Sequence, residues 1–172
     1  VTFSTVINAW AQTGSSQVAE KAEALLHQVQ ELHNHQDWPD VDVKPNTVMY
    51  TAVIHAWANA GNAERADMLL QQMYQEYAME HNHDVKPGIR TFKTVLSAWS
   101  KSRDQDALEH AEALLRKMRE LYESGLLDCN PNVISYNNIF QSLSKQRKNP
   151  QAVEKAESYI QEMIQLATTA SS

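Results

Sequence analysis

The chain has 172 residues, a formal net charge of −6, one cysteine, four glycines and five prolines. The lone cysteine excludes an intramolecular disulfide and is typical of proteins from a reducing compartment. No apolar run reaches the length of a membrane span, so no membrane contact is expected. No signal or transit peptide is recognisable either, and the helical pattern starts at Val1 without a preceding cap.

Helical patterns follow one another in pairs along the first half of the chain. A helix is predicted over 1–11 and a second one over 17–32, with a polar loop after it. The next pair is predicted over 47–61 and 65–79. Gly61 suits the left-handed end of its first helix, and the following Asn62 can cap the start of its second.

The second half of the chain continues in the same way. A third pair starts at Ile89, turns over 102–106 and ends near Gly125. A fourth pair turns at Asn149-Pro150, where Asn caps the helix and Pro takes its first position.

Each pair repeats the same two apolar stripes, with residues at i, i+3, i+4 and i+7. In the first helices the stripes are Phe3-Val6-Ile7-Trp10, Tyr50-Val53-Ile54-Trp57, Phe92-Val95-Leu96-Trp99 and Tyr136-Ile139-Phe140-Leu143. In the second helices they are Ala22-Leu25-Leu26-Val29, Ala66-Leu69-Leu70-Met73, Ala111-Leu114-Leu115-Met118 and Ala156-Tyr159-Ile160-Met163. A pattern that recurs every 42 to 47 residues indicates a solenoid of stacked helical hairpins.

A fixed punctuation separates the hairpins. It reads Val43-Lys44-Pro45-Asn46, Val85-Lys86-Pro87-Gly88 and Cys129-Asn130-Pro131-Asn132, and an aromatic residue follows four positions later. Together with Ala-Glu-Ala-Leu-Leu at 22–26 and 111–115, this pattern resembles the pentatricopeptide repeat. The tetratricopeptide repeat would carry its Trp early in the first helix, whereas here the Trp is late.

The resemblance implies an all-α, right-handed α-solenoid of four stacked hairpins in one domain over 1–172. The repeats would occupy approximately 1–46, 47–88, 89–132 and 133–172. These repeats are longer than the family's usual unit of roughly 35 residues. The family's spacing of one nucleic-acid base per repeat therefore does not carry over directly to this chain. The chain is expected to be a fragment of a longer array.

Charge is distributed unevenly between the two kinds of helix. The first-helix segments 1–14, 47–61, 89–103 and 133–149 contain no Asp or Glu and sum to +7, whereas the remaining segments sum to −13. Because stacked hairpins place their first helices on one surface, one neutral-to-basic face and one acidic face are expected. A local basic face can attract a polyanion although the total charge is negative.

Residues beside the first stripe form the candidate reading face of such an array. Small hydroxyls and amides can hydrogen-bond a base edge, while aliphatic groups or Arg can pack on its flat face. The resemblance implies base selection by Ser4 with Asn46, whereas Thr51 is paired with Gly88, which has no side chain. Lys93 with Asn132 departs from the usual residue type and suits phosphate, and Asn137 suits a pyrimidine. The resemblance places Val1, Val48 and Ile134 at base-sandwiching positions, where Arg90 is a departure.

A simpler role remains open for two of these residues, because Asn46 and Asn132 can serve as helix N-caps. Catalytic and metal sites are not predicted: Cys129 has no partner at motif spacing, and the His-x-His pairs at 33–35 and 81–83 suit solvated loops.

The resemblance implies single-stranded RNA as the partner, no cofactor, and no enzymatic activity of the chain itself. It also implies a mitochondrial or plastid location and a role in transcript processing, stability or translation. The alternative is a protein-binding scaffold that uses the same groove, with the acidic outer face as a second surface for protein partners. Apolar pockets in the groove would favour a peptide, and aligned small polar residues would favour bases.

Overall fold

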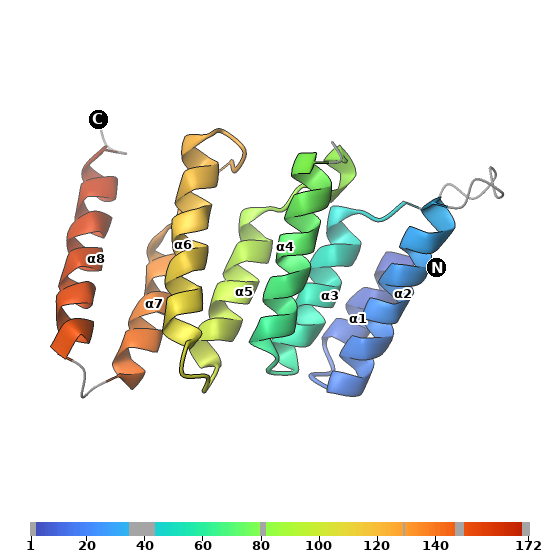
Figure 1. Ribbon diagram of the computed structural model, residues 1–172, viewed down its shortest axis with the longest axis horizontal. Helices are drawn as coiled ribbons and strands as arrows, with labels where there is room; N and C mark the ends of the chain where they lie inside the picture. Colours follow the sequence, from blue (N-terminus) through green and yellow to red (C-terminus); the bar gives the residue numbers. More distant parts are fainter. Residues whose placement is uncertain (1–2, 35–43, 80–81, 129, 147–149, 170–172) are drawn as a thin grey trace. The chain divides into compact units, whose positions relative to one another are not determined.

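The computed structural model describes residues 3–34, 44–79, 82–128, 130–146 and 150–169. Over these ranges the chain forms eight α-helices, one short 3-10 helix and no strand (Figure 1). The helices are α1 (Phe3–Ala11), α2 (Ser16–Asn34), α3 (Thr47–Asn59), α4 (Ala63–Met79), η1 (His83–Val85), α5 (Ile89–Lys101), α6 (Ala107–Glu123), α7 (Val133–Lys145) and α8 (Pro150–Thr169). The predicted all-helical class is therefore confirmed. None of the described helices is both long and apolar enough to cross a bilayer.

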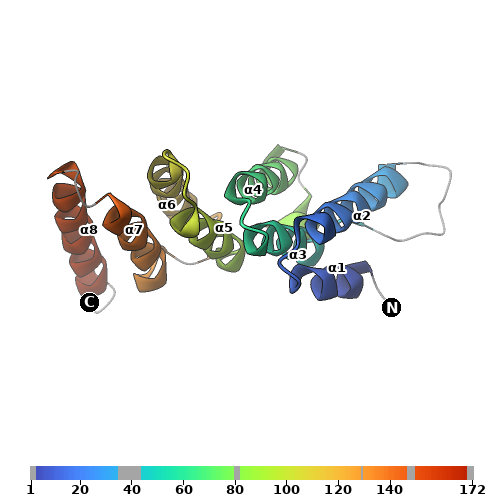
Figure 2. The ribbon, with the colours of Figure 1, turned by 90° about the horizontal axis from the view of Figure 1, so that it is seen from below.

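The chain divides into two compact units, residues 1–98 and 99–172, and the division falls within the last turns of α5. In the first unit, α3 contacts α1, α2 and α4. Figure 2 shows α1 and α3 side by side in the lower part of the view. Their partner helices α2 and α4 lie above them in the same view. In the second unit, α7 packs against both α6 and α8.

The apolar stripes form the core, as their spacing predicts. In α3, Tyr50, Val53 and Ile54 are fully buried, and Trp57 is 6% exposed. The facing stripe of α4 is equally buried from Ala66 to Met73. The stripe of α8 differs, because Ile160 is 49% exposed.

The turn between α3 and α4 matches its sequence signals. Gly61 has φ +80°, a left-handed conformation that costs glycine little. The Asn62 amide then donates to the Trp57 carbonyl at 3.0 Å, which closes the end of α3. The Asn62 side chain accepts from the Arg65 amide at 2.9 Å and so caps α4.

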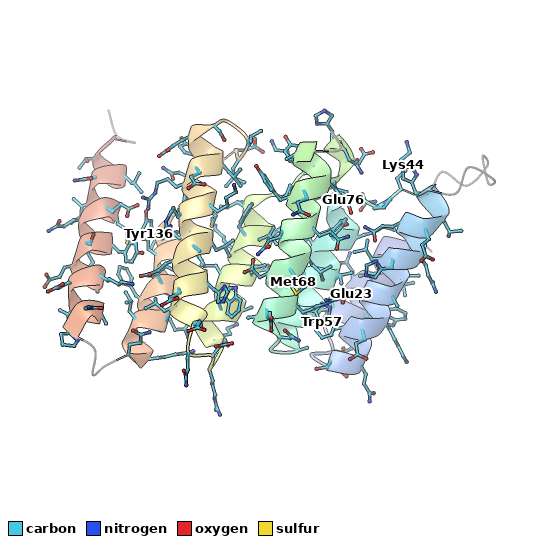
Figure 3. All side chains as sticks on the ribbon, viewed as in Figure 1. Glu23, Lys44, Trp57, Met68, Glu76 and Tyr136 are labelled. Atoms are coloured by element: carbon cyan, nitrogen blue, oxygen red, sulfur yellow. The ribbon has the colours of Figure 1, made fainter. Side chains whose placement is uncertain are left out.

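A carboxylate on the second helix of one hairpin binds the next hairpin within each unit. Glu23 of α2 accepts 2.8 Å from the Trp57 indole and 2.5 Å from an Arg65 guanidinium nitrogen (Figure 3). Glu112 of α6 occupies the same register and accepts 2.7 Å from the Lys155 ammonium. These hydrogen bonds and ion pairs fix the position of one hairpin against the next within each unit.

A tyrosine hydroxyl forms a second recurring link. Tyr50 donates to Glu76 and accepts from Gln30 of α2 at 2.6 Å. In the second unit, Tyr136 donates to Glu162 at 2.5 Å, and Arg119 of α6 pairs with that carboxylate. Each hydroxyl thereby ties the two helices of its own hairpin to the second helix of the hairpin before it.

Candidate nucleic-acid interface

A groove of about 360 Å³ runs across the first helices of the first unit. Residues of α1, α3 and the start of α5 line it, together with the residue just before α5. They are Asn8, Gln12, Thr47, Val48, Thr51, Ala52, His55, Gly88, Arg90, Thr91 and Thr94. The groove thus brings together three predicted contact residues, Val48, Thr51 and Arg90, with Gly88 beside them.

Most of the residues that line the groove are polar, and none of them is acidic. Its threonine hydroxyls and side-chain amides carry no charge, and they can both donate and accept hydrogen bonds. Val48 is an exception, with 52% of an aliphatic side chain exposed at the surface. Such a mixture suits a ligand that has flat apolar faces and hydrogen-bonding edges.

Thr51 is held in place by its neighbour on the next first helix. Its hydroxyl lies 3.0 Å from the Thr91 hydroxyl, and either oxygen can donate. Thr91 is only 1% exposed, so this contact fixes Thr51 from its buried side. Thr51 is half-buried and lines the groove, and the bond to Thr91 still leaves its hydroxyl further hydrogen-bonding capacity.

Thr47 positions the segment that precedes α5. Its hydroxyl lies 2.9 Å from the Lys86 carbonyl and 3.1 Å from the Asp84 carbonyl. These bonds hold the turn before Gly88 against the start of α3. An added Cβ at Gly88 would meet no atom within 4 Å, so the space over this residue is open.

Asn46 and Asn132 are helix N-caps. The Asn46 side chain accepts from the Met49 amide at 3.0 Å, and Asn132 accepts from the Ile134 amide at 3.2 Å. Gly88 occupies the same register before α5, because its carbonyl accepts from Phe92 as that of Asn46 accepts from Tyr50. The capping role open to both asparagines is therefore confirmed, and each retains an amide group for a further bond.

Two cations stand on the first turns of α5. Arg90 is exposed and lines the groove, whereas Lys93 is half-buried and lies outside its lining. Neither side chain forms an ion pair with any residue that the structure describes. Both charges are therefore available to an anionic ligand.

The remaining predicted residues lie elsewhere. Ser4 is in the first turn of α1, and Val1 is outside the described residues. Ile134 and Asn137 are both exposed on α7 in the second unit, where Ile134 is 56% exposed.

Sequence reasoning overlooked Gln12, Thr47, Thr91 and Thr94 as groove residues. Their signal was available, since these hydroxyls and the amide fall in segments that contain no acid. In the part of the chain that the structure describes, no three His, Cys, Asp or Glu side chains gather as metal ligands would.

The sequence matches a protein-family model and a known protein. The family model described as the pentacotripeptide-repeat region of PRORP matches residues 1–162. A pentatricopeptide repeat-containing protein of Arabidopsis thaliana is 30% identical over 137 residues, which are 80% of this chain. The chain spans about 20% of the length of that relative.

Proposed function

Since this chain belongs to the pentatricopeptide repeat family, we propose that it binds single-stranded RNA in the groove over α1, α3 and α5. The observation that carries the proposal is the groove lining, in which small polar side chains accompany an exposed aliphatic residue and an exposed Arg. Single-stranded bases are bound by this combination of edge hydrogen bonds and face packing.

One base position can be assigned to the first unit. Val48 and Arg90 occupy the same register in successive first helices, and both line the groove. A base between them would pack one face on the valine and the other on the planar guanidinium. The Thr51 hydroxyl would then form a hydrogen bond with the edge of that base. It would be the single reading group at this position, because Gly88 has no side chain.

The other predicted residues take matching roles in the remaining repeats. Ser4 with Asn46 contributes base choice in the first repeat, and Asn137 does so in the fourth, where Ile134 packs on a base. Lys93 contributes charge to a phosphate, and the family resemblance pairs it with Asn132 at the following cap. A flexible ammonium is a point charge with three donors, so it adds affinity without distinguishing bases.

The finer architecture that supports this mode is also a proposal. The repeats 1–46, 47–88, 89–132 and 133–172 would form one right-handed solenoid that presents its first helices to the RNA. The protein would act in a mitochondrion or plastid, as a non-enzymatic adaptor in transcript processing, stability or translation. A peptide-binding scaffold is less favoured, because Val48 and Ala52 are the only aliphatic residues among those that line the groove.

Binding is tested by fluorescence anisotropy with labelled single-stranded RNA, the matching DNA and an RNA duplex over a salt series. We expect weak binding to the single strand, because at most four bases are contacted at about 1–3 kcal/mol each before ordering costs. Arg90→Ala should weaken binding, because it removes the guanidinium that packs on the base and a positive charge that lines the groove. Arg116→Ala is the matched control, since Arg116 is exposed on α6, a second helix.

Two results would overturn the proposal. One is equal affinity for the duplex and the single strand. The other is an equal loss of affinity in the Arg90 and Arg116 variants, which would show a diffuse charge effect instead of a groove.

A further inference from the structure

Two threonines at the groove use their hydroxyls in different ways, although both lie within a first helix. The Thr94 hydroxyl donates at 3.0 Å to the Arg90 carbonyl, four residues earlier in its own helix. The Thr51 hydroxyl instead lies 3.0 Å from the Thr91 hydroxyl on the next first helix. Among the residues that the structure describes, Thr91 is the one side-chain hydrogen-bond partner of Thr51.

A bond back to its own helix is the usual alternative for a threonine such as Thr51. The χ1 angle of a helical threonine is divided between two rotamers, because the hydroxyl can reach the carbonyl three or four residues earlier. For Thr51 the carbonyl four residues earlier belongs to Thr47. A hydroxyl turned toward that carbonyl presents its oxygen to the groove in a different direction from one held by Thr91. The partner on α5 therefore selects the orientation of Thr51.

The burial of Thr91 determines the direction of the hydrogen bond. Thr91 is 1% exposed, and its hydroxyl bonds no described residue other than Thr51. If Thr51 donated, the Thr91 hydroxyl hydrogen would be buried without an acceptor, which costs free energy. Thr91 is therefore the donor and Thr51 the acceptor. Thr51 is half-buried and lines the groove, so it keeps its own hydroxyl hydrogen for a ligand.

This contact connects two successive repeats in a fixed register. Thr51 stands directly after the stripe aromatic Tyr50, and Thr91 stands directly before the stripe aromatic Phe92. In α3 the position of Thr91 is occupied by Met49, which is buried and has no hydroxyl. The hydroxyl partner is therefore a property of the second repeat and its successor, and not of every first helix.

We propose that Thr91 is a positioning residue for base recognition in the second repeat, an inference that rests on the proposed RNA groove. Thr91 contacts no base itself. By donating to Thr51 it holds that hydroxyl away from the Thr47 carbonyl and leaves the Thr51 hydrogen for the edge of the bound base. Base choice in one repeat then depends on a buried side chain of the next hairpin.

The orientation of Thr51 can be measured without any RNA. Three-bond NMR couplings to the Thr51 methyl carbon in the 172-residue chain report its χ1 angle. We expect one rotamer in the wild type and a shift toward the second rotamer in Thr91→Val, which keeps the shape of threonine without its hydroxyl. Thr91→Ser keeps a hydroxyl and should restore the wild-type couplings. Unchanged couplings in Thr91→Val overturn the proposal.

Base discrimination is the second readout, from titrations with single-stranded RNAs that differ at one position. The ratio of their dissociation constants should fall about threefold or more in Thr91→Val and recover in Thr91→Ser. The salt dependence should stay unchanged, because no charge is removed. Added to Thr51→Val, the Thr91→Val substitution should change the ratio no further, since the hydroxyl that it positions is already absent.

Thr94→Val is the matched control, because it removes a threonine hydroxyl that bonds its own helix, and it should keep the wild-type discrimination. Circular dichroism should show the wild-type helix content for every variant. RNA binding in the groove with undiminished discrimination in Thr91→Val overturns the positioning role and leaves the proposed function standing. Equal affinity for duplex and single strand overturns the proposed function, and this inference with it.

Discussion

The Trp57 indole N–H of α3 donates a 2.8 Å hydrogen bond to the Glu23 carboxylate of α2. Glu23 is 6% exposed and also receives two hydrogen bonds from Arg65, so both of its carboxylate oxygens accept from the next hairpin. In the second unit Leu143 occupies the register of Trp57, and Glu112 Oε1 has no hydrogen-bond partner among the residues that the structure describes. At equivalent positions, Glu23 therefore accepts hydrogen bonds through both carboxylate oxygens, whereas Glu112 accepts from Lys155 through one of its two.

We predict unequal costs for removing these two carboxylates. Glu23→Ala should lower the free energy of unfolding by about 2 kcal/mol, because it leaves the Trp57 N–H buried without an acceptor. Glu112→Ala should cost less than about 1 kcal/mol, because one of its oxygens is already unsatisfied and Lys155 is 42% exposed to water. Urea denaturation followed by circular dichroism measures both, with the exposed Glu20→Ala as the reference. An equal loss at the two sites would contradict this account.

The second unit should lose stability in alkali. Burial, followed by the neighbouring Glu112 carboxylate, raises the pKa of Tyr159 to about 12. Burial and the bond to Glu162 also raise the pKa of Tyr136. Between the ordinary tyrosine pKa of about 10 and these higher values, the folded state holds protons that the unfolded state has released. Stability is therefore fully present below pH 10 and declines as the pH rises toward 12.

Tyr159→Phe tests that reasoning, because it should flatten the decline of stability over this pH range. Absorbance at 295 nm should also show one fewer late-titrating group among the six tyrosines of the chain. A variant whose alkaline stability profile matches the wild type would remove Tyr159 as a cause.

Gly88→Asn should add both a helix cap and a reading group. Gly88 lies at the register of the caps Asn46 and Asn132, and an added Cβ there meets open space. We expect a gain of a few tenths of a kcal/mol in stability, the usual difference between Gly and Asn at a cap. In RNA titrations, the variant should also gain a base preference in the second repeat. A gain in stability without any change of base preference would assign this position to capping alone.

Thr51→Val should separate base choice from affinity. Valine keeps the shape of threonine but removes the hydroxyl that faces the groove and Thr91. Discrimination among RNAs that differ at one position should fall, while the salt dependence stays unchanged. Thr94→Val is the control, because its hydroxyl bonds the Arg90 carbonyl of its own helix. Equal effects of the two substitutions would count against a reading role for Thr51.

The helices and their core were accessible from the sequence because spacing determines them. The spacing i, i+3, i+4 and i+7 places four side chains on one face of a helix. In α3 these are Tyr50, Val53, Ile54 and Trp57, and all four are buried. The cap residues Asn46 and Asn62 were predictable for the same reason, since capping is a local contact. Local pattern thus accounts for most of the fold.

Contacts between hairpins were less accessible. The bond from Thr51 to Thr91 joins residues 40 positions apart, and the Glu23–Trp57 bond spans 34. A sequence pattern does not give the relative rotation of two stacked hairpins, which decides these pairs. The glutamate in Ala-Glu-Ala-Leu-Leu did offer a signal, because it recurs inside an otherwise apolar stripe.

The Glu112 oxygen that lacks a partner among the described residues affects where the folded chain opens locally. In a stacked array each hairpin is held by its nearest neighbours, and native-state opening begins where a neighbour contact is weakest. The α6–α7 contact lacks the indole that completes the α2–α3 contact, because Leu143 occupies the register of Trp57. Backbone amides of α7 should therefore exchange with solvent through openings that cost less free energy than those that expose α3.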